Sequence, residues 1–140
     1  MIFVDANVPM YIVGDDDRHK VDAQRAVERL AGERDRLVTS SEVFQEILHR
    51  YLSIARRDAI ELAFETLRGI VDDVLAVEGA DVFVAKDLIH AHPRLSARDA
   101  LHVAVMRRHE ITEIVSFDRG FDAVAGINRL PAPDSITNRG

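Results

Sequence analysis

Residues 2–8, IFVDANV, place three apolar side chains directly before Asp5 and the start of a second apolar segment. A short apolar run with β-branched members is typical of a buried strand. An aspartate just before a helix commonly accepts its first amide hydrogens. The stretch therefore predicts a strand over residues 2–4, a helix over about 7–13, and Asp5 at the carboxyl end of the strand.

Strand and helix patterns alternate through the rest of the chain. Further strands are predicted over about 36–38, 74–78, 112–117 and 128–130, and helices over about 19–32, 41–55, 58–71, 80–91, 96–109 and 119–125. Such alternation predicts an α/β fold, a three-layer α/β/α sandwich with a mostly parallel sheet. We expect one domain over residues 1–140, with a mobile tail over about 131–140.

The composition limits the chemistry that the chain can perform. With 140 residues, 47% of them hydrophobic, the chain is long enough to bury one core. It contains no cysteine, which excludes disulfides, thiolate zinc sites and cysteine nucleophiles. The first apolar segment has no basic leader and is interrupted by Asp5 and Asn7, which argues against a signal peptide or a membrane span. We expect a cytoplasmic protein.

Three acidic residues stand where a parallel sheet forms its binding sites, beyond the carboxyl ends of the strands. Asp5 follows the first predicted strand, Asp118 follows the strand over 112–117, and Asp99 lies in the first turn of a helix, where the helix dipole favours an anion. Ionised carboxylates repel by roughly 4 kcal/mol per pair at 4 Å in an effective dielectric of about 20. The cluster therefore predicts a cation, Mg²⁺ or Mn²⁺.

Glu46 is the fourth candidate, on the helix predicted over 41–55. The apolar side chains of that helix share one face: Val43, Phe44, Ile47, Leu48, Tyr51 and Ile54. Glu42 and Glu46 are expected on the other side. Each acid also has a structural alternative: Glu46 could simply pair with Arg50, Asp5 or Asp99 could cap a helix, and Asp118 could mark a turn.

The spacing of two histidines suggests a different kind of metal site. Glu46 and His49, and likewise Asp99 and His102, repeat the carboxylate-x-x-His spacing of di-iron sites in helical bundles. That arrangement needs four long helices and leaves Asp5 and Asp118 unused. We favour the carboxylate site for this reason.

The net charge of −6 argues at first against a nucleic-acid partner. The arginines are nevertheless concentrated beside the acidic positions: Arg50, Arg56 and Arg57 follow Glu46, Arg94 and Arg98 precede Asp99, and Arg119 follows Asp118. Each could equally be a solvated helix residue. Their distribution is therefore compatible with phosphate binding beside the acids.

Four segments, taken in order, resemble the PIN-domain family and, more narrowly, the VapC-type toxins of bacterial toxin–antitoxin pairs. They are FVDANV (3–8), SSEVFQEILHRY (40–51), LSARDALHVAVMRRH (95–109) and IVSFDRGFD (114–122). Each segment is weakly specific alone. The four together, in the family's order and at family-like spacing, are specific and span nearly the whole chain.

The resemblance implies an endoribonuclease dependent on Mg²⁺ or Mn²⁺, which acts as a homodimer and is controlled by an antitoxin protein. The family's acidic residues fall on Asp5, Glu46, Asp99 and Asp118, with Asp122 as an additional acid. Ser116, where the family often has Thr, and Asn7 would support them, and Arg50 or Arg98 would hold the RNA backbone. A DNA-directed nuclease and a non-catalytic interaction module of the same fold remain alternatives.

The apolar content of residues 41–71 predicts a protein partner. Large apolar side chains are frequent there for a small domain: Phe44, Leu48, Tyr51, Leu52, Ile54, Ile60 and Phe64. Apolar surface beyond what one sheet face covers favours a docking groove. By the resemblance, this groove would receive an antitoxin helix.

Overall fold

The computed structural model describes residues 1–15, 17–33 and 35–130, so the tail predicted over 131–140 lies outside the described residues. Within them, five strands form one sheet in the order β3-β2-β1-β4-β5, and every neighbouring pair is parallel. The strands are β1 (Ile2–Val4), β2 (Leu37–Ser40), β3 (Asp73–Leu75), β4 (Glu113–Val115) and β5 (Asn128–Leu130). The predicted α/β sandwich is confirmed.

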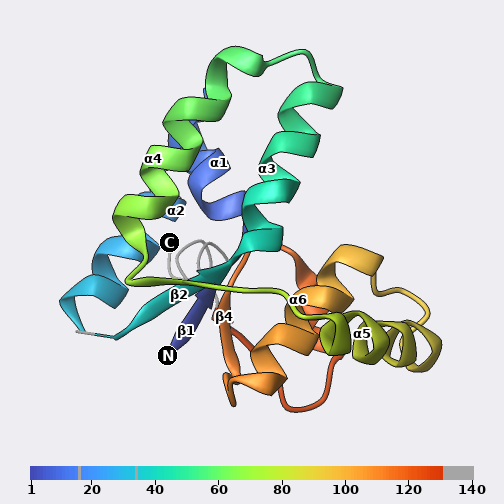
Figure 1. Ribbon diagram of the computed structural model, residues 1–140. Helices are drawn as coiled ribbons and strands as arrows, with labels where there is room; N and C mark the ends of the chain where they lie inside the picture. Colours follow the sequence, from blue (N-terminus) through green and yellow to red (C-terminus); the bar gives the residue numbers. More distant parts are fainter. Residues whose placement is uncertain (16, 34, 131–140) are drawn as a thin grey trace.

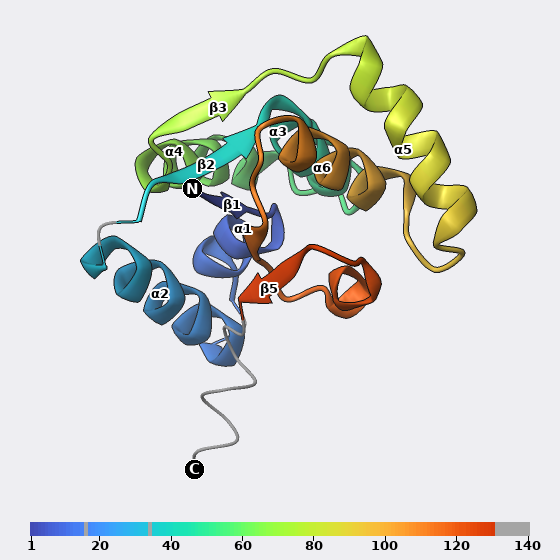
Figure 2. The same cartoon turned by 90° about the horizontal axis from the view of Figure 1, so that it is seen from below.

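Helices cover both faces of this sheet. They are α1 (Asn7–Val13), α2 (Asp17–Gly32), α3 (Ser41–Ser53), α4 (Ile60–Ile70), α5 (Gly79–Ala91) and α6 (Ala97–Arg108), with 3₁₀ helices η1 (Arg57–Ala59) and η2 (Arg119–Ala123). The chain runs from β1 through β2 to β3 in one direction and then crosses back to β4. Because crossovers are right-handed, this reversal puts α1 and α2 on one face and α5 and α6 on the other (Figure 2). Helices α3 and α4 form an antiparallel pair that extends away from the sheet (Figure 1).

Two predicted strands extend too far. The strand predicted over 74–78 ends at Leu75, because Glu78 and Asp81 form a capping box that begins α5 and the Ala76 carbonyl accepts a hydrogen bond from Arg108 Nη2 at 2.7 Å. The strand predicted over 112–117 ends at Val115. Ser116 leaves the sheet and turns its side chain towards the end of β1.

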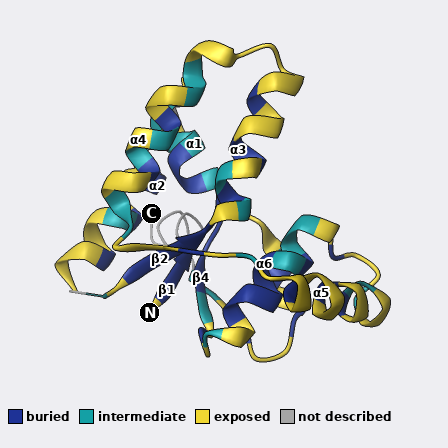
Figure 3. Ribbon diagram, viewed as in Figure 1, coloured by how far each residue is buried: buried dark blue, intermediate teal, exposed yellow. Residues whose placement is uncertain are grey.

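Helix α6 is the most deeply buried helix element near the site. Much of its ribbon is coloured as buried (Figure 3), and Ala100, Val103, Val105 and Met106 are fully buried. At its end, the Arg108 guanidinium donates to both oxygens of Asp81, at 2.9 and 3.0 Å, and so fastens α5 to α6. None of the helices in the described part of the chain has both the length and the apolar composition that crossing a bilayer requires.

Candidate active site

The candidate site lies at the carboxyl ends of β1 and β4. Strands β2 and β3 follow on one side of β1, and the chain then crosses to β4 on the other side. The strand order therefore reverses between β1 and β4, and this edge is the topological switch point of the sheet. Asp5 directly follows β1, and Asp118 follows β4 after two residues. Glu46 comes from α3, which begins where β2 ends, and Asp99 comes from the first turn of α6. Four distant segments thus bring their carboxylates to one edge.

Asp5 is buried and held by hydrogen bonds from its neighbours. Its Oδ1 accepts from the Ala6 amide at 2.8 Å, and its Oδ2 accepts from Ser116 Oγ at 2.7 Å and, weakly, from Asn7 Nδ2 at 3.5 Å. Burial raises the pKa of Asp5 above its ordinary value, and His102 and these hydrogen bonds oppose the rise. No side chain caps α1, so Asp5 does not act as the predicted helix cap.

Ser116 links the ends of β1 and β4. Besides donating to Asp5, its Oγ accepts from Asn7 Nδ2 at 3.1 Å and from the Asp118 amide at 3.0 Å. Asn7 Oδ1 in turn accepts from the Phe117 amide at 3.3 Å. One fully buried hydroxyl therefore sets the relative position of the first and last acidic segments.

Glu46 is buried, which corrects the prediction that it lies on the polar side of its helix. Its Oε1 is 3.2 Å from Nε2 of His102, and its Oε2 is 3.6 Å from Arg50 Nε and 3.9 Å from Arg98 Nη1. The reason is that α3 contacts α6 as well as α4, so two of its faces are covered. Leu48 and Ile54, predicted on the buried face, are exposed.

His102 is a site residue that the sequence suggested only within the di-iron alternative, and its place between Asp5 and Glu46 was not predicted. Its side chain is fully buried, with Nε2 3.2 Å from Glu46 and 3.7 Å from Asp5 Oδ1. One donor atom from each of Asp5, Glu46 and His102 lies within 4.8 Å of the others. His49 is exposed, and the described sheet leaves no place for the four-helix site that its spacing suggested.

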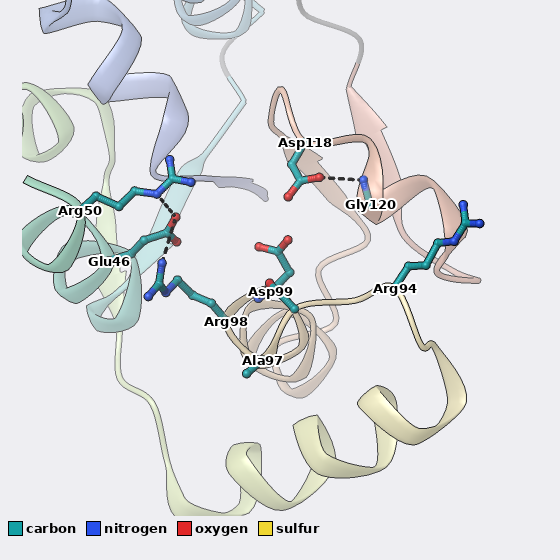
Figure 4. Close-up of a pocket in the computed structure, with 9 residues that line it drawn as sticks. Glu46, Arg50, Arg94, Ala97, Arg98, Asp99, Asp118 and Gly120 are labelled. Atoms are coloured by element: carbon teal, nitrogen blue, oxygen red, sulfur yellow. Dashed lines mark hydrogen bonds and ion pairs between the residues drawn. The ribbon is translucent and has the colours of Figure 1, made fainter. Parts of the chain in front are cut away.

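Asp99 and Asp118 form the second acidic pair, with their carboxyl groups turned towards each other (Figure 4). Burial raises the pKa of Asp99 to about 8, helped by a hydrogen bond with Asp118 and by the negative charges of Asp5, Asp118 and Glu46. The same hydrogen bond, with one from the Gly120 amide at 2.8 Å, lowers the pKa of Asp118. Ser96 Oγ accepts from the Asp99 amide at 3.1 Å, so the helix cap is Ser96, and the Asp99 carboxyl is left to the site.

A cleft of about 440 Å³ opens beside these acids. It is lined by Glu46, Asp99 and Asp118 and by three arginines, Arg50, Arg94 and Arg98. Arg50 and Arg98 point towards Glu46, and Arg94 points away from the acids (Figure 4). The cleft therefore combines ligands for a cation with donors for an anion.

Asp122 is placed differently from the other acids. It is exposed, and both of its oxygens accept from the Arg129 guanidinium, at 3.0 and 3.1 Å. Arg129 also donates to the Ser116 carbonyl at 3.3 Å. Asp122 thus supports the β4 end of the site through Arg129.

The donor set suits a hard divalent cation. Asp5, Glu46, Asp99 and Asp118 offer only carboxylate oxygens, the ligands that Mg²⁺ and Mn²⁺ prefer. The pKa of Asp99 is raised first by burial and then by the negative charges of its neighbours Asp5, Asp118 and Glu46. A bound cation would compensate that charge.

The sequence and the fold identify the class of protein. A sequence profile of the PIN domain matches residues 2–127. The chain belongs to the PIN-domain family, as its motifs indicated.

Similar proteins and solved structures carry VapC or VapBC names. Ribonuclease VapC13 of Mycobacterium tuberculosis is 55% identical over 130 residues, which cover 93% of this chain and 99% of that protein. The crystal structure of Mycobacterium tuberculosis VapC20, described as a sarcin-ricin loop cleaving toxin, has a TM-score of 0.73 at 26% identity and covers 93% of this chain and 98% of its own. VapBC2 of Rickettsia felis, bound to a promoter DNA fragment, shares the fold with a TM-score of 0.71 at 13% identity, covering 93% of this chain and 98% of its own.

Proposed function

We propose that this chain is an endoribonuclease that hydrolyses RNA phosphodiester bonds with a divalent cation, Mg²⁺ or Mn²⁺, and that it acts as a toxin controlled by an antitoxin. The observation that carries the proposal is the convergence of three carboxylates, Glu46, Asp99 and Asp118, and two inward-pointing arginines on one cleft, with the buried Asp5 close to Glu46. RNA as the substrate class is supported by the ribonuclease name of VapC13 and by the description of VapC20 as a toxin that cleaves the sarcin-ricin loop.

Asp5, Glu46, Asp99 and Asp118 would hold the cation, with Asp122 in a supporting role. When bound, the cation supplies Lewis acidity towards water and towards the phosphate oxygens. Asp5 is preoriented for this role, because Ser116 and the Ala6 amide fix its two oxygens from opposite sides. The four ligands are carried by strand ends and helices, which position side chains more accurately than mobile loops do.

Arg50 and Arg98 would bind the RNA backbone beside the cation. Their contacts with Glu46, at 3.6 and 3.9 Å, are longer than a charge-assisted hydrogen bond, so either guanidinium can turn to a phosphate without losing a strong partner. This arrangement explains how a chain with a net charge of −6 can bind a polyanion. Arg50 and Arg98 line the cleft, and a bound cation would offset part of the negative charge of its carboxylates.

The decisive experiment offers matched RNA and DNA oligonucleotides to the purified protein with Mg²⁺, with Mn²⁺ and with EDTA. We expect cleavage of RNA, dependence on the cation, and loss of activity in Asp5→Asn. Glu42→Gln, altered one turn away on the same helix as Glu46, is the matched control and should remain active. Preferential cleavage of DNA would establish the DNA-directed alternative, and cation binding without cleavage of either substrate would establish a non-catalytic module.

The partners are tested separately. Exposed apolar side chains on and after α3 and on α4, Leu52, Ile54 and Leu62, at 46%, 60% and 53% exposure, support an antitoxin helix as the occupant of this surface. Expression of the chain in the bacterial cytoplasm should arrest growth, and co-expression of its antitoxin should relieve the arrest. Light scattering at micromolar concentration should give a homodimer, and a monomer would refute that part of the proposal.

A further inference from the structure

The imidazole of His102 lies fully buried between two of the proposed cation ligands. Its Nε2 is 3.2 Å from Glu46 Oε1 and 3.7 Å from Asp5 Oδ1. Its ring packs against the buried Phe3, with ring centroids 5.5 Å apart. The ring therefore has one position available to it, and Nε2 faces the acids.

The surroundings of the other ring nitrogen, Nδ1, distinguish between a cation ligand and a hydrogen-bond donor. Among the described residues, Nδ1 is buried and has no hydrogen-bond partner. A histidine that binds a metal through Nε2 carries its proton on Nδ1 and almost always donates that proton to a carboxylate, a carbonyl or a water. Here no protein atom of the described residues would accept such a proton, and leaving it without a partner would be costly. With the proton on Nε2, the histidine donates to Glu46, and Nδ1 is left with only an unused lone pair.

We propose that His102 is a positioning residue that holds the Glu46 carboxylate beside Asp5 through its Nε2–H, and that it is not itself a cation ligand. The bond uses Oε1 of Glu46 and leaves Oε2 on the side of Arg50 and Arg98, where the cleft opens. It also joins α6 to α3, two helices that belong to different crossovers of the sheet. This inference rests on the cation site proposed above and assigns the position of Glu46 within it.

Nuclear magnetic resonance of the whole chain with ¹⁵N-labelled histidine tests the assignment directly. The His102 ring, identified by its disappearance in His102→Gln, should show a proton on Nε2 in EDTA and should keep it at saturating Mg²⁺, which is diamagnetic. A proton on Nδ1, or loss of the Nε2 proton when Mg²⁺ is added, would overturn the proposal. This measurement needs no nuclease activity and is made on the wild-type chain, since the variant serves only to assign the signal.

Mn²⁺ affinity, measured by electron paramagnetic resonance, tests the consequence. His102→Leu fills most of the space but cannot donate, whereas the amide of His102→Gln can donate from near the position of Nε2. We expect His102→Leu to weaken binding about tenfold or more, the usual effect of losing a group that orients a ligand, and His102→Gln to restore most of it. His49→Leu, exposed on α3, is the control and should bind as the wild type does.

The outcomes separate this proposal from the cation site on which it rests. A wild-type protein that binds no Mn²⁺, or binds it no better than Asp5→Asn does, would remove the cation site itself. Wild-type binding that is lost in Asp5→Asn but unchanged in His102→Leu would remove only the role of His102. Equal losses in the folded Leu and Gln variants would also refute it, because they would show that the ring and not the donated proton matters.

Discussion

Replacing Asp99 by asparagine should flatten the pH dependence of stability in the cation-free protein. The pKa of Asp99 is raised to about 8, first by burial and then by Asp118, Asp5 and Glu46. The folded state therefore binds this proton more tightly than the unfolded chain, whose carboxyl has a pKa of 3.8. The stabilisation of the folded state by this bound proton is fully present below about pH 4 and is lost as the pH rises towards 8. Asparagine keeps the size of the side chain and has no proton to lose.

The magnitude follows from the proton balance. One proton difference corresponds to about 1.4 kcal/mol per pH unit, so about 2 kcal/mol is the upper limit between pH 6 and 7.5. Asp99 is partly exposed and shares its proton with Asp118, and screening and sharing reduce the figure to about 1 kcal/mol. For a chain of this size, the wild-type melting temperature should fall by about 3–4 °C more than that of Asp99→Asn. Because the pKa of Asp118 is lowered, its effect on the pH dependence of stability falls at acidic pH, below this range.

Differential scanning calorimetry in EDTA at pH 6 and pH 7.5 measures the effect. Mg²⁺ competes with protons for the carboxylates, so its stabilisation of the wild type should be larger at pH 7.5, reaching about 2.7 kcal/mol at 100 times its Kd. Asp122→Asn, which alters an exposed carboxylate, is the control and should keep the wild-type slope. Equal slopes in wild type and Asp99→Asn, or greater wild-type stability at pH 7.5 in EDTA, would refute the reasoning.

Three further substitutions test the rest of the site. Glu46→Gln should suppress RNA cleavage in a gel assay while Glu42→Gln keeps most of it, and a more damaging Glu42→Gln would contradict the assignment. Ser116→Ala should cost about 1–3 kcal/mol in urea unfolding, because it leaves buried partners such as Asp5 without their hydroxyl, and Ser116→Thr should cost less; equal costs would argue against the hydrogen bonds. Asp122→Asn should change stability by less than about 1 kcal/mol, since its carboxylate is exposed and asparagine keeps one oxygen for the mostly buried Arg129, and should reduce Mn²⁺ affinity less than Asp5→Asn does in calorimetric titration.

The sequence predicts most of the fold because its local patterns agree with the tertiary structure. Helix α1 spans residues 7–13 and β1 spans residues 2–4, as predicted, since an apolar run followed at once by a polar break leaves little choice of boundary. The gathering of Asp5, Asp99 and Asp118 is predictable for a different reason. Parallel strands end at one edge, so residues just after strands, or just inside a following helix, meet there whatever the details of packing.

The position of Glu46 and the role of His102 depend on which helices touch. Periodicity along α3 shows one apolar face, but a helix that contacts both α4 and α6 buries a second face as well. The available signal for His102 was a polar residue inside the apolar run ALHVAVM, three residues after Asp99. That signal places the two side chains on the same face of α6. It does not show that the opposite partner is Glu46, because that contact joins residues 56 positions apart.

Asp5 and Asp99 both have raised pKa values, but the groups around them differ. Burial raises the pKa of Asp5 most and the negative charge of Glu46 adds to the rise, whereas His102 and the donors Ser116 and Ala6 oppose it. Burial also raises the pKa of Asp99 most, and the carboxylates of Asp118, Asp5 and Glu46 each raise it further. A cation at this edge would therefore relieve the repulsion among these carboxylates and favour the charged form of Asp99. The protein's own donors organise the Asp5 half of the site in advance, whereas a cation would supply the compensating charge for the Asp99 half.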